Sequence, residues 1–324
     1  MPFPHAKLRS PLRPLAKFLG VLAVAVLAAA IVSYPAWLLV GLVSDQPIHR
    51  VLHRLVMLAV FCVLVLCARR LALANRQALG FAGERAGFLL QLRLGFCAGC
   101  LTILPLIALL YALGVRVPMA DAHQHAAVWL NAAQLKLIAN GLASGLVIGL
   151  IEEVFFRGAM FTAMQRESGT LAAIAVPSLL YAALHFVGGR LDVPADQIGW
   201  TSGFAVVVAM FDKLAHPVAI VDSFVALATA GALLAWVRAR TGNIATSIGL
   251  HAAWVCTIAW VRGTTRLDTN HAASWLVGSY DGIMGWGSVC FVIALALAYM
   301  ALRRLNVSLT AIRVRPGTGD EVMK

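Results

Sequence analysis

The sequence predicts an all-α integral membrane protein with about eight transmembrane helices. Of its 324 residues, 61% are hydrophobic and only 12% are charged, whereas a soluble domain carries about 25% charged residues. Apolar runs recur along the chain at close to the ~20 residues that a helix needs to cross a bilayer. These runs are too long and too uniformly apolar for barrel strands, so they are expected to be helices, whose backbone polar groups are paired internally.

The apolar runs set the expected spans. They are 18–43, 51–73, 94–115, 137–164, 170–187, 218–239, 244–262 and 285–303. The first run follows a basic segment, as in a signal peptide, but it is too long for a signal peptide's apolar region and indicates an uncleaved helix. The long connection from residue 188 to 217 contains an apolar piece, Phe204–Phe211, that could be re-entrant or interfacial.

Basic residues predict the orientation and the partners. Alternate connections are rich in Arg, while the others mix Arg or Lys with Asp, so both termini are expected in the cytoplasm. The net charge of +12 lies in short segments between apolar runs rather than on a basic, aromatic surface. This distribution argues against nucleic acid as a partner and suits an anionic membrane surface. We expect the lipid bilayer of a bacterial inner membrane as the environment, and the oligomeric state stays open.

Four regions follow from these spans. They are a basic cytoplasmic tail (1–17), a three-helix membrane region (18–133), a central membrane core (134–262), and a last transmembrane helix with a cytoplasmic tail (263–324).

A stripe of small residues in the fourth span leads to charged residues. The small residues are Gly141, Gly145 and Gly149, and Glu153 and Arg157 continue the same four-residue spacing. Residues at this spacing share one helix face, and small residues let another helix approach closely. The face is therefore expected to contact protein, with Glu152 near its edge.

Two acidic residues in a membrane span need an explanation. A carboxylate at the depth of a helix centre costs at least about 2.5 kcal/mol, and Glu153 offsets part of this cost by pairing with Arg157 at i+4. A purely structural ion pair explains these two residues but leaves Glu152 without a partner. An unpaired acid inside the membrane is a candidate for function.

Two further spans contribute histidines, His185 and His251. A lone histidine in a span is more often a hydrogen-bonded core residue, but two histidines and a Glu-Glu pair on three spans change that balance. Together they have the groups for general-base activation of water and for stabilisation of an oxyanion. They could equally form a His₂Glu site, the ligand types of a hydrolytic zinc enzyme.

The order of these residues resembles a known family of intramembrane proteases, the CAAX-protease and bacteriocin-processing (CPBP or Abi) family. Residues 152–158 look like its EExxxR signature, and residues 181–185 match its FxxxH motif with Tyr181 replacing Phe. A third motif is similar through Phe224, Gly231, Thr241 and Gly242, with Leu227 where Gly is usual. His251 matches the start of the HxxxN motif. The resemblance covers residues 141–262.

The resemblance implies a glutamate-dependent endopeptidase that acts on a membrane-anchored protein or peptide. Glu152 would be the general base, Glu153 and Arg157 would support it, His185 would hold the water, and His251 would stabilise the oxyanion. No cofactor is implied by this mechanism. A divalent metal such as zinc, held by Glu152, His185 and His251 as in a metalloendopeptidase, is the alternative.

The chain departs from the family where Val255 stands in place of the HxxxN asparagine. In the related Ras-converting prenyl endopeptidases that Asn shares the oxyanion role, and losing one such donor costs about 10²–10³-fold in kcat. Asn243, Thr246 and Thr257 are candidate replacements. Two rival functions follow: a catalytically silent scaffold or partner-binding protein, or a proton-coupled transporter, since intramembrane Glu and His also form proton relays.

Overall fold

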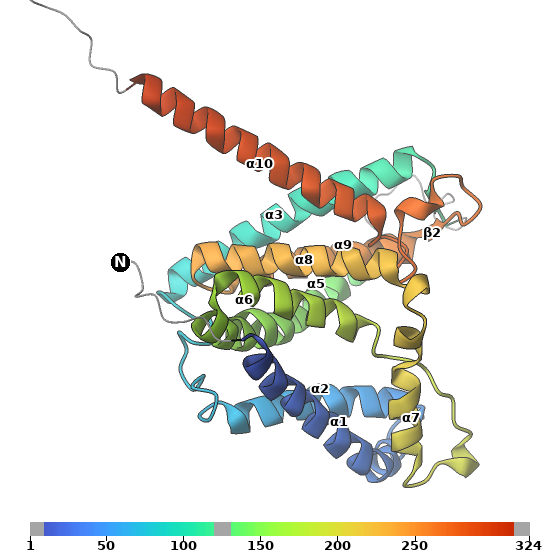
Figure 1. The fold of residues 1–324 in the computed structure, drawn as a ribbon. Helices are drawn as coiled ribbons and strands as arrows, with labels where there is room; N and C mark the ends of the chain where they lie inside the picture. The colour runs from blue at the N-terminus through green and yellow to red at the C-terminus, as the bar shows by residue number, and fades with distance from the viewer. Residues whose placement is uncertain (1–9, 120–130, 314–324) are drawn as a thin grey trace, which may run out of the picture.

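Helices dominate the computed structural model (Figure 1). The structure describes residues 10–119 and 131–313, with backbone only at residue 299 and from residue 302 onward. The helices are α1 (Leu12–Gly41), α2 (Ile48–Cys67), α3 (Arg85–Ala112), α5 (Ala132–Glu153), α6 (Phe161–His185), α7 (Ser202–Met210), α8 (Val221–Thr241), α9 (Ala245–Thr264) and α10 (Trp286–Arg313). A π-helical segment, Val154–Met160, joins α5 to α6. Two short strands, β1 (Arg116–Pro118) and β2 (Thr265–Leu267), pair antiparallel. The all-α fold class is confirmed.

The described helices carry the apolar character of an integral membrane protein. Within residues 10–119 and 131–313, five helical stretches are long and apolar enough to cross a membrane: α1, α2, α3, the joined α5–α6 unit and α8. Leu39, Leu66 and Leu101 are 67%, 79% and 73% exposed, as lipid-facing residues would be. The count of eight crossings stays a prediction, as do the cytoplasmic termini. Lys7 and Arg9 of the expected N-terminal tail lie outside the described residues.

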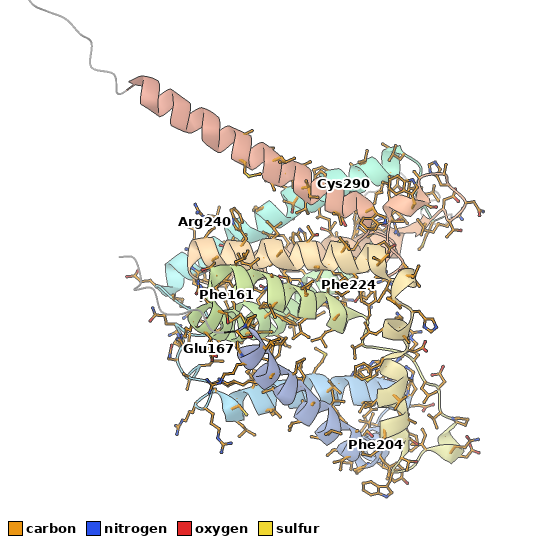
Figure 2. All side chains as sticks on the ribbon, viewed as in Figure 1. Phe161, Glu167, Phe204, Phe224, Arg240 and Cys290 are labelled. Atoms are coloured by element: carbon orange, nitrogen blue, oxygen red, sulfur yellow. The ribbon has the colours of Figure 1, made fainter. Side chains whose placement is uncertain are left out.

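The helices form two groups (Figure 1). Helices α5, α6, α8 and α9 lie side by side in the centre with α3 beside them, whereas α1, α2 and α7 lie together on one side. The apolar piece expected at Phe204–Phe211 is α7, which packs on α1 and α2. Side chains fill the space between α6 and α8, where Phe161 and Phe224 belong to one apolar core (Figure 2).

The fourth and fifth expected spans are separate helices, as predicted, and they meet at a kink inside the stretch labelled α6. The direction changes at Gly169, which has a φ of 86° inside α6. Glycine adopts this left-handed conformation without the steric cost that other residues pay. The span expected at 137–164 is helical throughout, but residues 154–160 form a π-helical turn that begins directly after Glu153.

Glycines let α9 lie against its neighbours at close range. A Cβ built on Gly145 would lie 2.6 Å from the carbonyl oxygen of Ala252, and one on Gly149 would lie 3.7 Å from the Cβ of His251. Gly99 of α3 packs on the opposite side of α9, against Leu250. The glycine stripe of α5 therefore faces protein as predicted, and it brings the end of α5 next to His251.

Replacing Gly145 with Ala tests this contact. The added Cβ meets backbone, which cannot move away as a flexible side chain can, so Gly145→Ala should destabilise the protein by about 1–3 kcal/mol. The change is expected even though Ala favours helix over Gly. Gly87→Ala in α3 is the matched control, since nothing lies within 4 Å of its added Cβ. The measurement is thermal unfolding in detergent, and equal midpoints for both variants would contradict the close approach.

Candidate active site

A chain of three buried charged or polar side chains lies at the end of α5. Arg157 Nη1 donates to Glu153 Oε1 at 2.9 Å, and the same oxygen accepts from His251 Nδ1 at 3.0 Å. All three residues are buried, with Glu153 and Arg157 at 0% and 1% exposure. Since the carboxylate joins a cation to the imidazole, Glu153 fixes the orientation of the His251 ring.

Arg157 is anchored by neighbours from two other helices. Its Nη2 donates to the carbonyl of Gly231 on α8 at 3.0 Å, and its guanidinium lies 4.6 Å from the ring centre of Tyr181 on α6. From α8, Arg238 Nε donates to the Arg157 carbonyl at 3.1 Å. This carbonyl belongs to the π-helical segment, and such segments occur frequently at functional sites.

Glu152 faces the other nitrogen of His251. Its Oε2 lies 3.8 Å from His251 Nε2, which is longer than a direct hydrogen bond. That oxygen is buried and has no hydrogen-bond partner among the described residues, although the Glu152 side chain as a whole is 27% exposed. Glu152 and Glu153 thus occupy different environments: Glu153 is fully buried and paired, and Glu152 opens onto a cavity.

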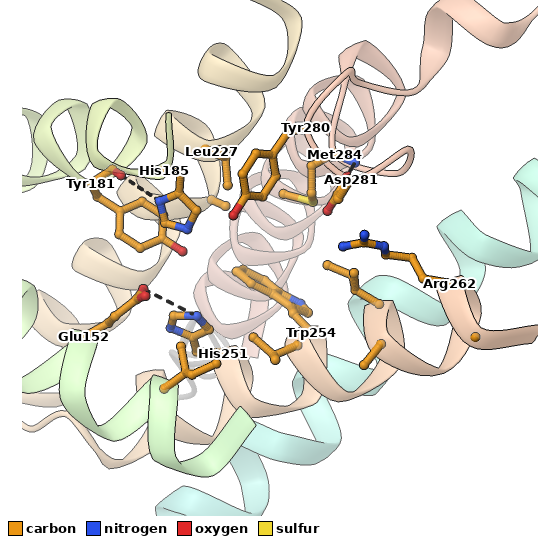
Figure 3. A pocket seen from close by; sticks show the side chains of 16 residues that line it. Glu152, Tyr181, His185, Leu227, His251, Trp254, Arg262, Tyr280, Asp281 and Met284 are labelled. Atoms are coloured by element: carbon orange, nitrogen blue, oxygen red, sulfur yellow. Dashed lines mark hydrogen bonds and ion pairs between the residues drawn. The ribbon is translucent and has the colours of Figure 1, made fainter. Parts of the chain in front are cut away.

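His185 lies across this cavity from Glu152 and His251 (Figure 3). Its Nδ1 lies 2.8 Å from the Tyr181 carbonyl oxygen. A carbonyl only accepts hydrogen bonds, so Nδ1 is the protonated nitrogen and, in the neutral ring, Nε2 is an acceptor. Nε2 is the ring nitrogen that points into the cavity (Figure 3).

The cavity has a volume of about 610 Å³ and is formed by four helices and a loop. Its polar lining combines residues expected from the sequence, Glu152, His185 and His251, with residues that were not expected: Tyr181, Arg262, Tyr280 and Asp281. Leu227 of α8 adds an apolar wall. The expected cluster on the fourth, fifth and seventh spans therefore comes together, with Glu153 and Arg157 buried behind it.

The loop between α9 and α10 is held over the cavity by hydrogen bonds. Tyr280 N donates to Ser223 Oγ at 3.2 Å, and Asp281 Oδ1 accepts from Met284 N at 2.7 Å. Arg116 of β1, itself buried, donates to the Gly282 carbonyl at 2.9 Å. Burial, together with the nearby Asp281 and Glu152 carboxylates, raises the pKa of Tyr280 to about 12, so its hydroxyl keeps its proton at neutral pH.

Val255 lines the same cavity as His251, one helical turn further along α9. The three residues considered as replacement donors do not line it. Asn243 is used elsewhere, since its Oδ1 accepts from Ala245 N at the start of α9 and its Nδ2 donates to Gln91. Thr246 and Thr257 lie outside the lining as well. The substitution of these three for the HxxxN asparagine is therefore not supported by their positions.

The metal alternative was tested against the geometry of the proposed ligands. Among residues 10–119 and 131–313, no group of three or more His, Cys, Asp or Glu side chains lies in an arrangement that could hold a metal ion. Glu152, His185 and His251 share the cavity. His251 and His185 each have Nδ1 bound, to Glu153 and to a carbonyl, which leaves Nε2 of each ring without that contact. Metal-ligating histidines are oriented in the same way, so zinc binding stays a prediction.

These features define an all-α membrane protein with a buried Glu-Arg-His cluster beside a polar cavity. Residues 134–257, the part of the chain that contains the site, match the family model described as type II CAAX prenyl endopeptidase Rce1-like. The resemblance to the CAAX-protease family is thereby confirmed for this central region. No curated protein and no solved structure matches the chain.

The third motif of the resemblance has a structural explanation. Gly231 leaves room for α6, because a Cβ there would lie 3.2 Å from the Tyr181 ring, and its carbonyl accepts from Arg157. Gly242 ends α8 in the left-handed conformation with φ 74°, as helix C-caps commonly do. Thr241 Oγ1 donates toward the Asn243 carbonyl at 2.9 Å. Thr241 and Gly242 shape the turn that leads into α9.

Breaking the buried ion pair should cost far more than breaking an exposed one. Arg157→Met leaves the Glu153 carboxylate buried with its cation removed, which typically costs about 3–5 kcal/mol. Lys17→Met is the matched control: it breaks the Lys17–Glu167 pair, whose side chains are 41% and 25% exposed, and such pairs contribute about 0–1 kcal/mol. Unfolding in detergent measures both, and a similar loss in the two variants would argue against a buried, tightly coupled pair.

Proposed function

We propose that this protein is an intramembrane endopeptidase that hydrolyses a peptide bond of a membrane-associated protein or peptide. The observation that carries the proposal is that Glu152, His185 and His251 face one cavity from three helices, while Glu153 and Arg157 are buried behind them. The match to the Rce1-like family supports a protease of the CAAX type. Among the described residues, no Ser, Cys or Thr lines the cavity, so attack by activated water is favoured over a covalent mechanism.

In the first step a water molecule attacks the carbonyl carbon of the substrate. The Glu152 carboxylate accepts one proton of the water and acts as general base, while His185 Nε2 accepts a hydrogen bond from the other proton. The new C–O bond forms as the carbonyl π pair moves onto its oxygen. Glu152 suits this role because it lines the cavity, whereas Glu153 lies behind it. One carboxylate oxygen of each glutamate, Oε2, has no hydrogen-bond partner among the described residues.

His251 stabilises the oxyanion that forms. His251 Nδ1 donates a hydrogen bond to Glu153, so His251 Nε2 can donate to the oxyanion only when the ring carries both protons. The nearby carboxylates of Glu152 and Glu153 balance the charge of that imidazolium. In the second step the C–N bond breaks and the proton held by Glu152 passes to the leaving amine. The products are a carboxylic acid, which then passes its proton to the amine or to water, and an amine. The enzyme groups return to their initial states.

Glu153 and Arg157 act as positioning residues in this mechanism. Glu153 joins the Arg157 guanidinium to the His251 ring through one oxygen. A donor that is already oriented needs no reorganisation as charge develops, and such preorganised electrostatics are a large part of enzymatic rate enhancement.

The substrate is proposed to reach the cavity from the lipid bilayer. The walls of the cavity combine the polar groups of the site with apolar residues such as Leu227, Trp254 and Met284. The matching family is named for prenyl CAAX substrates. For this chain, the lining is compatible with any membrane-anchored protein or peptide that presents the peptide bond of an extended segment to Glu152.

Replacing Glu152 with Gln tests the proposal most simply. The amide cannot take the proton of the water, so Glu152→Gln should lower cleavage of a membrane-anchored peptide reporter by at least the 10²–10⁴-fold that general-base catalysis provides. Glu84→Gln, at an exposed acid before α3, should leave the rate unchanged. The assay uses purified full-length protein in liposomes. If wild-type and Glu152→Gln protein both cleave a broad peptide library only at the background rate, the result would favour a catalytically silent scaffold instead.

A metal chelator provides an independent test of the mechanism. None of the steps above uses a metal, so cleavage should persist after dialysis against EDTA, with less than about a twofold change in rate. The loss of a catalytic Lewis acid would change the rate far more, because such a metal lowers the activation free energy by several kcal/mol. The metal content of the purified protein should be measured in parallel. Activity that EDTA abolishes and zinc restores would overturn the metal-free mechanism.

A further inference from the structure

The residue one turn beyond His251 is Val255, which lines the cavity but cannot donate a hydrogen bond. An oxyanion held only by His251 would lack a second donor, and the removal of one such donor typically costs about 10²–10³-fold in kcat. Among the described lining residues, the uncharged side chains with a donor are Tyr181, Tyr280 and Trp254. Trp254 is engaged, because its Nε1 donates to Thr102 at 2.9 Å.

Tyr181 is held rigidly on three sides. Its ring lies 4.6 Å from the Arg157 guanidinium, 5.3 Å from the Phe156 ring and 4.4 Å from the His185 ring. Gly231 provides the space for the fourth side. Tyr181 is only 4% exposed, yet it lines the cavity. Its hydroxyl points into the space between His185, Glu152 and His251 (Figure 3).

The position of this hydroxyl matches the needs of an oxyanion donor. The Tyr181 and His251 rings lie edge to face with their centres 6.2 Å apart, and the Tyr181 hydroxyl points toward the space in front of His251 (Figure 3). No described residue accepts a hydrogen bond from the Tyr181 hydroxyl, which leaves the donor available. A fixed donor aimed at developing charge is the arrangement that stabilises transition states most.

We propose that the Tyr181 hydroxyl is the second oxyanion donor of this protein and takes the place of the donor that Val255 lacks. The inference rests on the proposed endopeptidase function. It joins two departures of the chain from its motifs, since Tyr181 stands where FxxxH has Phe and Val255 stands where HxxxN has Asn. One departure removes a donor from the cavity and the other adds one.

The hydroxyl donates a hydrogen bond without giving up its proton. As water attacks and the carbonyl oxygen becomes negative, that oxygen accepts from Tyr181 Oη and from His251 Nε2. When the carbonyl re-forms and the C–N bond breaks, both hydrogen bonds weaken and both protons stay on the enzyme. Tyr181 is thus a catalytic residue that touches the reacting oxygen, distinct from the general base Glu152.

Tyr181→Phe tests this role because it removes only the hydroxyl. We expect kcat to fall by about 10²-fold with KM nearly unchanged, since the bond strengthens as charge develops. Adding Val255→Asn to Tyr181→Phe should recover at least about tenfold in kcat, whereas Val255→Asn alone should be neutral or harmful, because a buried amide without partners is costly. Tyr111→Phe, at an exposed tyrosine of α3, is the matched control, and thermal unfolding checks that every variant folds.

Three outcomes would overturn the inference. One is a Tyr181→Phe enzyme with wild-type kcat while Glu152→Gln abolishes cleavage, which would leave the endopeptidase function intact and remove Tyr181 from it. The second is a loss of kcat in Tyr280→Phe instead, which would assign the donor to the α9–α10 loop. The third is a Tyr181→Phe defect that Val255→Asn does not relieve, because the two positions would then not serve the same oxygen.

Discussion

The rest of the site depends on the burial of one carboxylate between a cation and an imidazole. Glu153 is fully buried and binds Arg157 and His251 through a single oxygen. Removing such a charge from water is costly unless its partners are close and well oriented, so the packing around it is constrained. The glycines of α5 and α3 bring α9 close enough for His251 to reach Glu153, and Gly231 lets Tyr181 cover Arg157.

This arrangement divides the work between two adjacent glutamates. They lie about 100° apart on a helix, so one points into the protein and the other toward the cavity. Glu153 orients His251, and Glu152 lines the cavity. The π-helical segment begins at the next residue and gives Arg157 its place behind both. The loop bearing Tyr280 and Asp281 covers the cavity because Arg116 and the start of α8 hold it.

Much of this could be predicted from local patterns. Apolar length predicted the helices, and the four-residue spacing from Gly141 to Arg157 predicted a protein-facing stripe, since both patterns report on one helix at a time. The π-helical turn was missed because its residues are as apolar as those of a regular helix. Tyr280, Asp281 and Arg116 were missed because loop contacts across 57 and 166 residues of sequence leave no periodic signal. Tyr181 was identified as a motif position, but its hydroxyl gained meaning only from the cavity it faces.

The central claim is that Glu152 activates water for direct attack inside the membrane. It is tested most directly by a single turnover in H₂¹⁸O, with enzyme in excess over a membrane-anchored peptide, followed by mass spectrometry of the product and of the enzyme. Direct attack predicts one ¹⁸O atom in the new carboxylate of the product and none in Glu152. Product that carries an unlabelled enzyme oxygen, with ¹⁸O appearing in the Glu152 carboxylate, would contradict the account, because it would show that Glu152 attacked the substrate itself.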